Sequence, residues 1–165
     1  MKIDGESYRS IWVDDDGWSV RIIDQTLLPH ELAAPRLADL EAAAAAIATM
    51  QVRGAPLIGV TAAYGLALAL REAGSDAALD TARSVLLGTR PTAVNLRWAV
   101  DRVTDVVASL PPGERAAAAY RAAAAMADAD VARNRALGEH GLERIRELAA
   151  RRAGEPVRIL THCNA

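Results

Sequence analysis

Residues 56–70 (PLIGVTAAYGLALAL) carry no charged side chain and form the longest apolar run in the 165-residue chain. The run falls short of the roughly 20 residues that a membrane-spanning helix needs. Pro56 suits the first turn of a helix, where its missing N–H is no loss, so the sequence predicts a helix that is apolar on nearly every face. Such a helix must be buried, which makes a mainly helical domain or a self-associating helical module the expected structure around it.

Other segments supply helices to cover this one. The alanine-rich residues 37–49 are strongly helix-forming. Ser75 or Asp76 is expected to cap the next helix, which should end near Gly88. Thr92 is expected to cap a further helix that runs to about residue 110.

A long alanine-rich region, residues 113–151, is also predicted to be helical, with a bend or break around Gly138 and Gly141. Its charged residues lie at helical spacing and suggest ion pairs from Glu143 to Arg146 and from Glu147 to Arg151. This pattern is typical of a solvated helix face and does not indicate a basic stripe for nucleic acid.

Both ends of the chain depart from the helical pattern. Residues 8–13 and 18–23 are β-branched and aromatic runs on either side of a turn sequence that ends in Gly17, and they predict a β-hairpin. Residues 157–160 (VRIL) predict one strand of a parallel sheet, whose neighbouring strands are not in this sequence. We therefore expect an α/β protein with a hairpin and helical domain at residues 1–154 and the first strand of another domain at residues 155–165.

Composition narrows the functional classes. Hydrophobic residues make up 52% and charged residues 24% of the chain, as in ordinary folded proteins. The net charge of −2 gives no general attraction for nucleic acid. A single cysteine allows no internal disulfide, and the histidines do not have the spacing of metal ligands, so no metal site is expected. The N-terminus does not resemble a signal peptide, which predicts a cytoplasmic protein.

Two segments could bind an anion. In residues 51–56 (QVRGAP), Arg53 offers a fork of donors, Gly54 allows close approach of the backbone, and Ala55 and Pro56 open a helix with unpaired N–H groups. In residues 89–95 (TRPTAVN), Arg90 likewise precedes a helix start. Each segment is equally compatible with a simple turn between helices, and the two could also converge on one phosphate group.

The only cysteine, Cys163, follows the predicted strand 157–160. Ligands bind in the crevice at the carboxyl ends of strands in open α/β sheets, where a thiol can act as an acid, a base or a nucleophile. A buried structural cysteine is the alternative, because free cysteine is among the most buried residue types.

Five segments, in this order and spacing, resemble the methylthioribose-1-phosphate isomerase family, which shares a superfamily with regulatory subunits of the initiation factor 2B complex. They are DQTLLPHE (24–31), MQVRGAPLIGVTAAYG (50–65), RPTAVNLRWAVDRV (90–103), NRALGEHG (134–141) and ILTHCNA (159–165).

The resemblance implies an N-terminal domain with a small antiparallel sheet and helices, followed by a Rossmann-like catalytic domain. It implies a homodimer that uses no cofactor and isomerises 5-methylthioribose 1-phosphate to 5-methylthioribulose 1-phosphate in methionine salvage. By resemblance, Arg53, Gly54, Ala55 and Arg90 bind the substrate, and Cys163 is one of two catalytic residues. The other is an aspartate that lies downstream of residue 165, so the chain is expected to be a fragment lacking most of its catalytic portion, and inactive alone.

Two alternatives remain within the superfamily. One is an isomerase of ribose 1,5-bisphosphate or 5-deoxyribose 1-phosphate, because the residues that recognise the substituent at C5 are not evident in this sequence. The other is a noncatalytic regulatory subunit, against which the cysteine in the THCNA segment argues. An enediol route and a hydride shift both remain possible for the reaction.

Overall fold

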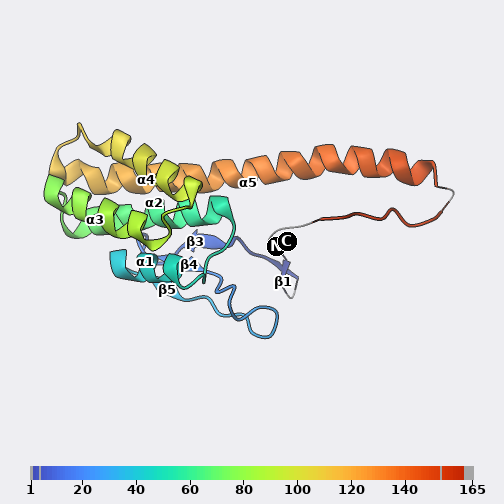
Figure 1. Cartoon of the computed structure of the whole chain (residues 1–165), viewed down its shortest axis with the longest axis horizontal. Coiled ribbons are helices and arrows are strands. Elements are labelled where there is room, and N and C mark those ends of the chain that lie inside the picture. Colours follow the sequence, from blue (N-terminus) through green and yellow to red (C-terminus); the bar gives the residue numbers. More distant parts are fainter. Residues whose placement is uncertain (1, 4, 153, 162–165) are drawn as a thin grey trace. The chain divides into compact units, whose positions relative to one another are not determined.

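The computed structural model describes residues 2–3, 5–152 and 154–161. The chain divides into two compact units, residues 1–127 and residues 128–165. The elements of the described residues are β1 (Lys2–Ile3), β2 (Glu6–Ser7), β3 (Ile11–Val13), β4 (Val20–Ile22), β5 (Arg36–Leu37), α1 (Leu40–Ala48), α2 (Ala55–Glu72), α3 (Asp76–Thr89), α4 (Val94–Val107) and α5 (Pro112–Ala150) (Figure 1).

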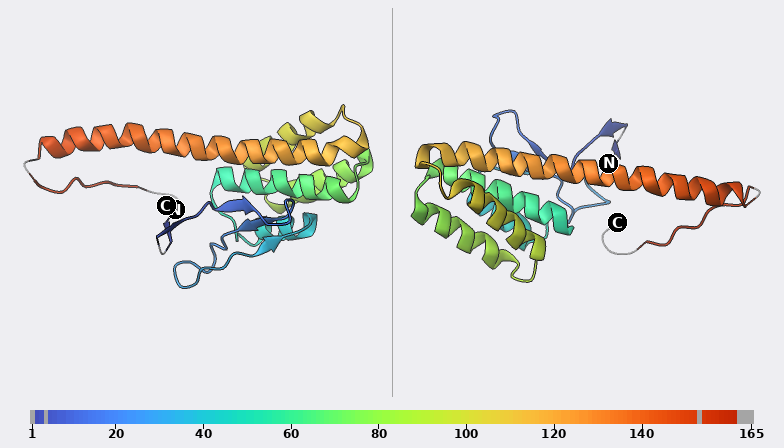
Figure 2. Two further views of the ribbon diagram at one scale, coloured as in Figure 1. Left: turned by 180° about the vertical axis from the view of Figure 1, so that it is seen from behind. Right: turned by 90° about the horizontal axis from the view of Figure 1, so that it is seen from above.

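The predicted hairpin is confirmed as the antiparallel pair β3–β4, and β5 adds antiparallel on the other side of β4. The connecting turn forms because Gly17 takes a φ of 75° and the Asp16 carboxylate accepts hydrogen bonds from the N–H groups of Trp18 and Ser19. Val20 and Ile22 point into the core and are fully buried. The sheet therefore provides one apolar face for the helices α1 and α2 (Figure 2).

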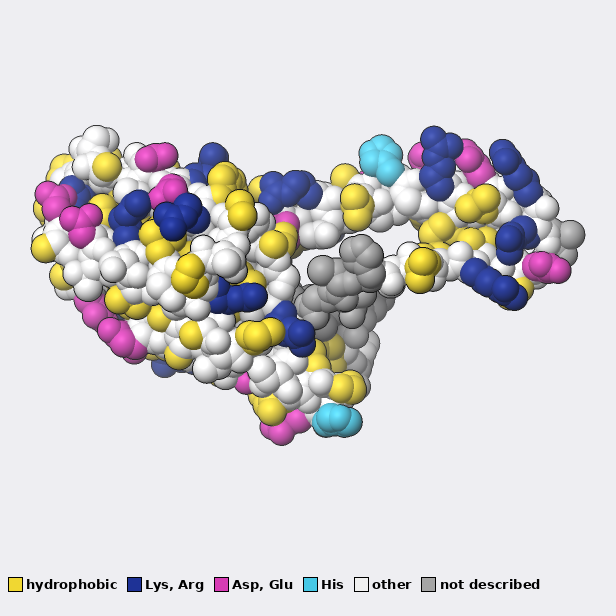
Figure 3. All heavy atoms as spheres, in the orientation of Figure 1, with side chains coloured by type: hydrophobic (Ala, Val, Ile, Leu, Met, Phe, Trp, Pro, Cys, Tyr) yellow, Lys and Arg dark blue, Asp and Glu magenta, His cyan; other side chains and the backbone are white. Residues whose placement is uncertain are grey.

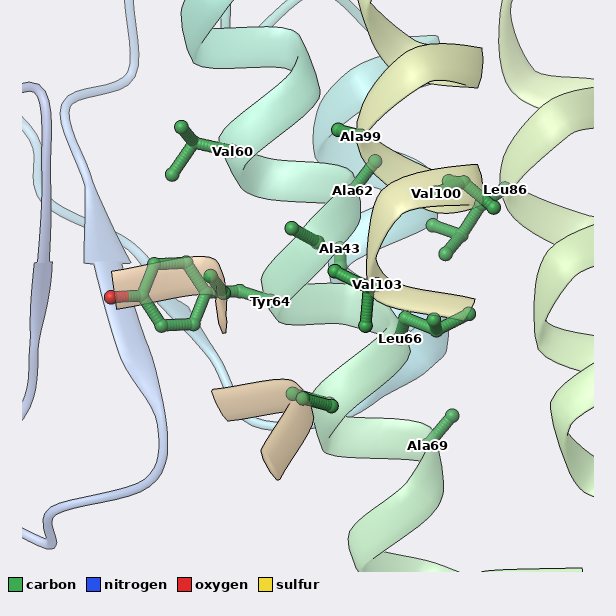
Figure 4. Close-up of a cluster of buried hydrophobic side chains, with 14 of the residues drawn as sticks. Ala43, Val60, Ala62, Tyr64, Leu66, Ala69, Leu86, Ala99, Val100 and Val103 are labelled. Carbon is green, nitrogen blue, oxygen red and sulfur yellow. The ribbon is translucent and has the colours of Figure 1, made fainter. Parts of the chain in front are cut away.

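The apolar run is confirmed as the central buried helix. All residues of α2 from Ile58 to Leu70 are buried. In Figure 4, Tyr64 points from α2 toward the strands, whereas Leu66 lies on the side of α4, next to Val103. The sheet and the other helices cover the apolar surface of α2 on all sides, so this helix needs no polar face.

Two of the neighbouring helices begin with side-chain caps. Asp39 accepts a hydrogen bond from the N–H of Ala42 at the start of α1, and Ser75 accepts one from Ala78 at the start of α3. The prediction of Ser75 is thus confirmed. The prediction of Thr92 as the cap of α4 is wrong, because Ala93 occupies the capping position and no side chain bonds to the first turn.

α5 is continuous from Pro112 to Ala150, so the predicted bend or break around Gly138 and Gly141 is wrong. Two glycines cost about 2 kcal/mol relative to alanine, and the flanking alanine, leucine, arginine and glutamate are strong enough helix formers to carry the helix across them. On its exposed surface Arg144 pairs with Glu147 at 3.1 Å, in place of the two pairs expected from the sequence.

Residues 155–161 form no strand, contrary to the prediction for residues 157–160. A strand is stabilised by hydrogen bonds to a neighbouring strand, and no described residue pairs with this segment. The α/β class and the small antiparallel sheet are confirmed, whereas the Rossmann-like domain remains a prediction. Within the described residues, none of the helices has the length and apolarity to cross a membrane.

Candidate functional site

The Arg53 turn connects α1 to α2. Met50 has a φ of 63° and Gly54 a φ of 87°, and these two left-handed residues reverse the chain between the helices. Val52 is fully buried between them, so Arg53, the next residue, faces solvent. Ala55 is the first residue of α2, and Gly54 occupies the capping position without a side chain that could bond to the first turn.

The Arg90 turn connects α3 to α4. Arg90 ends α3, and its carbonyl accepts a hydrogen bond of 3.0 Å from the N–H of Ala93. α4 then begins with Val94, again without a capping side chain. In the described part of the chain, no hydrogen bond or ion pair engages the guanidinium group of Arg53 or Arg90.

The starts of α2 and α4 lie against each other. A Cβ placed on Gly59, in the second turn of α2, would lie 2.8 Å from the carbonyl oxygen of Asn95 and 3.3 Å from the Cβ of Ala99. The two helices run in the same direction, and α3 returns between their ends (Figure 1). The Arg53 and Arg90 turns, which precede these two helix starts, therefore lie at the same end of the helix layer.

The electrostatics of this end favour an anion. A helix N-terminus carries a partial positive charge from its unpaired N–H groups. The first turns of α1, α3 and α5 each contain an acidic residue, whereas those of α2 and α4 contain none. Two uncapped helix starts and two guanidinium groups can together hold a phosphate through charge-assisted hydrogen bonds.

The structure thus brings the predicted residues Arg53, Gly54 and Ala55 to the same end of the helix layer as Arg90. The remaining predicted site residue, Cys163, lies outside the described residues. Among the described residues, no group of three or more histidine, cysteine or acidic side chains is arranged to hold a metal ion. A cavity of about 290 Å³ lies around the C-terminal end of α2, lined by Ala69 and Glu72 among others, and it includes neither arginine turn.

Sequence reasoning missed Asp24 and Gln51. The Asp24 carboxylate is buried at the end of β4 and accepts a hydrogen bond of 2.8 Å from the side chain of Gln51, two residues before Arg53. Burial alone would raise the pKa of Asp24, but hydrogen bonds from Thr26 and Gln51 outweigh it and lower the pKa below its usual value of 3.8. An aspartate directly after an apolar strand was the available signal.

Figure 3 shows basic, acidic and apolar side chains interspersed over the visible face, without an extended region of one charge. Such a surface provides no broad electrostatic field for a polyanion. On this face, recognition of an anion therefore has to be local.

Comparison with known proteins gives concordant results. The chain is 61% identical over 166 residues to the methylthioribose-1-phosphate isomerase of Acidiphilium cryptum, in an alignment that covers all of this chain and 45% of that protein. It spans less than half the length of that relative and of the isomerase of Rhodospirillum centenum.

Two solved structures share the fold. The translation initiation factor eIF-2B subunit delta from A. fulgidus matches with a TM-score of 0.75 and 39% identity, over 83% of this chain and 42% of that chain. The 5-methylthioribose 1-phosphate isomerase from Pyrococcus horikoshii matches with a TM-score of 0.67 and 37% identity, over 74% of this chain and 36% of that chain. Residues 51–165, most of the sequence, match the model of one family, and the chain belongs to that family, the initiation factor 2 subunit family.

Proposed function

We propose that the chain is the N-terminal portion of an aldose-ketose isomerase that converts 5-methylthioribose 1-phosphate to 5-methylthioribulose 1-phosphate. The supporting observation is the close contact between Gly59 and Asn95, which puts the uncapped starts of α2 and α4 side by side with Arg53 and Arg90. The names of the Acidiphilium and Pyrococcus relatives support the same reaction and the same substrate.

In this proposal the N-terminal portion holds the phosphate. Arg53 and Arg90 donate to its oxygens, and the N–H groups at the start of α2 add the partial charge of the helix end. The phosphate sits on the anomeric oxygen and blocks spontaneous ring opening, so the sugar has to be opened by a proton donated to its ring oxygen. We assign this acid–base chemistry to Cys163 and to an aspartate of a downstream catalytic domain.

The proposal includes a Rossmann-like second domain, a homodimer and a cytoplasmic location. We place the boundary between the two domains near residue 154, with the catalytic domain beginning at residue 155. The chain alone is then a binding portion without turnover. The second domain and the homodimer are what the resemblance implies, and the cytoplasmic location is the expectation from the lone cysteine and the N-terminal sequence. The alignments support a longer protein, because they leave more than half of each isomerase relative unmatched.

The test is a chimaera in which residues 1–165 are joined to the C-terminal portion of the Acidiphilium cryptum isomerase. We expect turnover of 5-methylthioribose 1-phosphate, measured by the formation of the ketose. Arg53→Met and Arg90→Met should raise KM, because each removes a donor to the phosphate, and Cys163→Ser should lower kcat. An inactive chimaera, prepared beside an active parent isomerase, would contradict the proposal.

A second candidate is a noncatalytic regulatory subunit, favoured by the higher TM-score of the initiation factor subunit from A. fulgidus. Such a subunit would bind a sugar phosphate or a nucleotide through the same two arginine turns without turning it over. Unchanged turnover in the Cys163→Ser chimaera would remove the cysteine from the proposed mechanism. A chimaera that binds the sugar phosphate but releases no ketose would favour the regulatory function.

A further inference from the structure

The Arg53 turn contains one residue, Met50, in a backbone conformation that its residue type does not favour. Met50 lies in the left-handed region with a φ of 63°, which is uncommon for a residue with a side chain. Gly54, four residues later, has a φ of 87°. Glycine adopts such a φ readily but has many competing conformations, and the conformation of Met50 is unfavourable, so contacts from outside the segment must select this turn.

Those contacts come from the segment that follows β4 and from α1. The side-chain amide of Gln51 donates a hydrogen bond of 2.8 Å to one carboxylate oxygen of Asp24. The backbone carbonyl of Gln51 accepts one of 2.9 Å from the N–H of Gln25. The next residue, Val52, is fully buried, and its N–H donates to the carbonyl of Ala46 at 3.3 Å.

Burial of the Asp24 carboxylate next to this turn costs free energy, because a charged group is removed from water. Asp24 is only 6% exposed, and within the described residues no lysine or arginine forms an ion pair with it. The charge is satisfied by hydrogen bonds alone: one oxygen accepts from the N–H of Thr26 at 2.9 Å and from its hydroxyl at 2.6 Å, and the other accepts from Gln51. An apolar pair at the two positions could pack together but would lack the directional constraint that a hydrogen bond adds.

We infer that Asp24 and Gln51 form a positioning pair that fixes the Arg53 turn, so that Arg53 meets the phosphate bound at the starts of α2 and α4. Neither residue touches the anion. The inference rests on the proposed function, because it assigns a purpose to the pair only if Arg53 binds an anion. The sequence predicted Arg53 as a site residue but indicated no group that would orient its turn. The Asp24–Gln51 pair supplies such a group.

The test uses the 165-residue chain and inorganic phosphate as the probe, with affinity measured by calorimetry at a temperature where circular dichroism shows every variant folded. Gln51→Leu keeps the size of the side chain and removes its amide, and we expect phosphate to bind about tenfold more weakly. Gln51→Glu should be at least as weak, because it sets two carboxylates against each other. The double variant Asp24→Asn with Gln51→Glu restores a donor–acceptor pair and should return the affinity close to that of the unaltered chain.

Asp14→Asn is the matched control. It removes the charge of a carboxylate at the β3–β4 turn that accepts a hydrogen bond of 2.9 Å from Arg21 and lies 3.4 Å from Arg36, and it should leave phosphate affinity unchanged. Arg53→Met separates the two proposals. If Arg53→Met weakens binding and Gln51→Leu does not, the positioning pair is refuted and the anion site stands.

If the exchanged pair fails to restore the affinity lost in Gln51→Glu, the loss comes from general damage and the positioning pair is again refuted. If the unaltered chain binds no phosphate, or if Arg53→Met and Arg90→Met leave binding unchanged, the anion site itself fails, and the positioning role fails with it.

Discussion

Replacement of Gly59 by alanine tests the contact that brings the two arginine turns together. The new Cβ would lie 2.8 Å from the carbonyl oxygen of Asn95, whereas ordinary van der Waals contact begins at 3.4 Å. The neighbour is backbone of α4 and cannot rotate away, so the start of α4 has to shift by roughly half an ångström. Overpacking of this kind costs about 1–3 kcal/mol.

The same substitution also has a favourable effect, because alanine is a better helix former than glycine by about 1 kcal/mol. Gly88→Ala in α3 serves as the matched control, since a Cβ at Gly88 would meet no atom within 4 Å. We expect Gly88→Ala to stabilise the fold by up to about 1 kcal/mol and Gly59→Ala to be less stable than Gly88→Ala by about 1–3 kcal/mol.

Thermal unfolding followed by circular dichroism measures the difference, at about 2–4 °C for each kcal/mol in a chain of this size. Phosphate titration of the same variants adds a second measurement. Because the shift moves the start of α4 away from α2, Gly59→Ala should also bind phosphate more weakly, whereas Gly88→Ala should not. Equal stabilisation by both substitutions would refute the close contact of α2 and α4, and with it the convergence of Arg53 and Arg90.

Three further measurements probe the framework. Arg115 is buried, donates hydrogen bonds to the carbonyls of Gly74, Ala108 and Leu110, and forms an ion pair with Asp76. Arg115→Met should therefore lower the free energy of unfolding in urea by about 2–4 kcal/mol, whereas Arg144→Met, at an exposed ion pair, should lower it by less than about 0.5 kcal/mol. Ser75→Ala should cost about 1 kcal/mol because it removes the cap of α3, whereas Thr92→Ala should cost almost nothing; equal effects would contradict the observed caps. Because the pKa of Asp24 is lowered by folding, its charged form stabilises the fold above about pH 4, and this stability is lost as the pH falls through the lowered pKa. Urea unfolding from pH 6 to pH 2 should show a smaller loss of stability in acid for Asp24→Asn than for the unaltered chain. Identical pH profiles would contradict the lowered pKa of Asp24.

The sequence allowed accurate prediction wherever one local effect was dominant. The hairpin followed from β-branched residues around a glycine turn, and the buried helix followed from an apolar run bounded by Pro56 and charged residues. The cap of α3 was predictable because two adjacent residues with capping side chains, Ser75 and Asp76, stand at its start, and Ser75 is the one that caps it. In these cases the local preference and the final packing agree.

Prediction failed where local and long-range effects compete. Thr92 has a good capping side chain, yet the turn from Arg90 to Ala93 closes one residue later and leaves it outside the helix. Gly138 and Gly141 weaken a helix locally, but α5 has strong helix formers on both sides. Residues 157–160 have strand propensity without a described partner strand, and propensity alone does not form a sheet.

The candidate site was predictable by residue type but not by geometry. Arg53 and Arg90 are 37 positions apart, and the packing of α2 against α4, closest at Gly59 and Asn95, brings their turns to the same end of the helix layer. Asp24 was invisible as a contributor, because a buried carboxylate is recognised only when its hydrogen-bond partners, here Thr26 and Gln51, are seen.

The distribution of caps along the chain connects stability with the proposed binding of an anion. α1 and α3 each begin with a side chain that bonds to the first turn, worth about 1 kcal/mol apiece. α2 and α4 lack this stabilisation. The extended backbone of Ala93 would accept a serine or an aspartate as a cap, whereas the φ of 87° at position 54 favours glycine. A capping side chain would occupy the N–H groups that an anion needs, and an aspartate would also repel it. α2 and α4 are also the two helices whose starts lie together near Arg53 and Arg90, so the missing side-chain caps fall where phosphate binding would replace them.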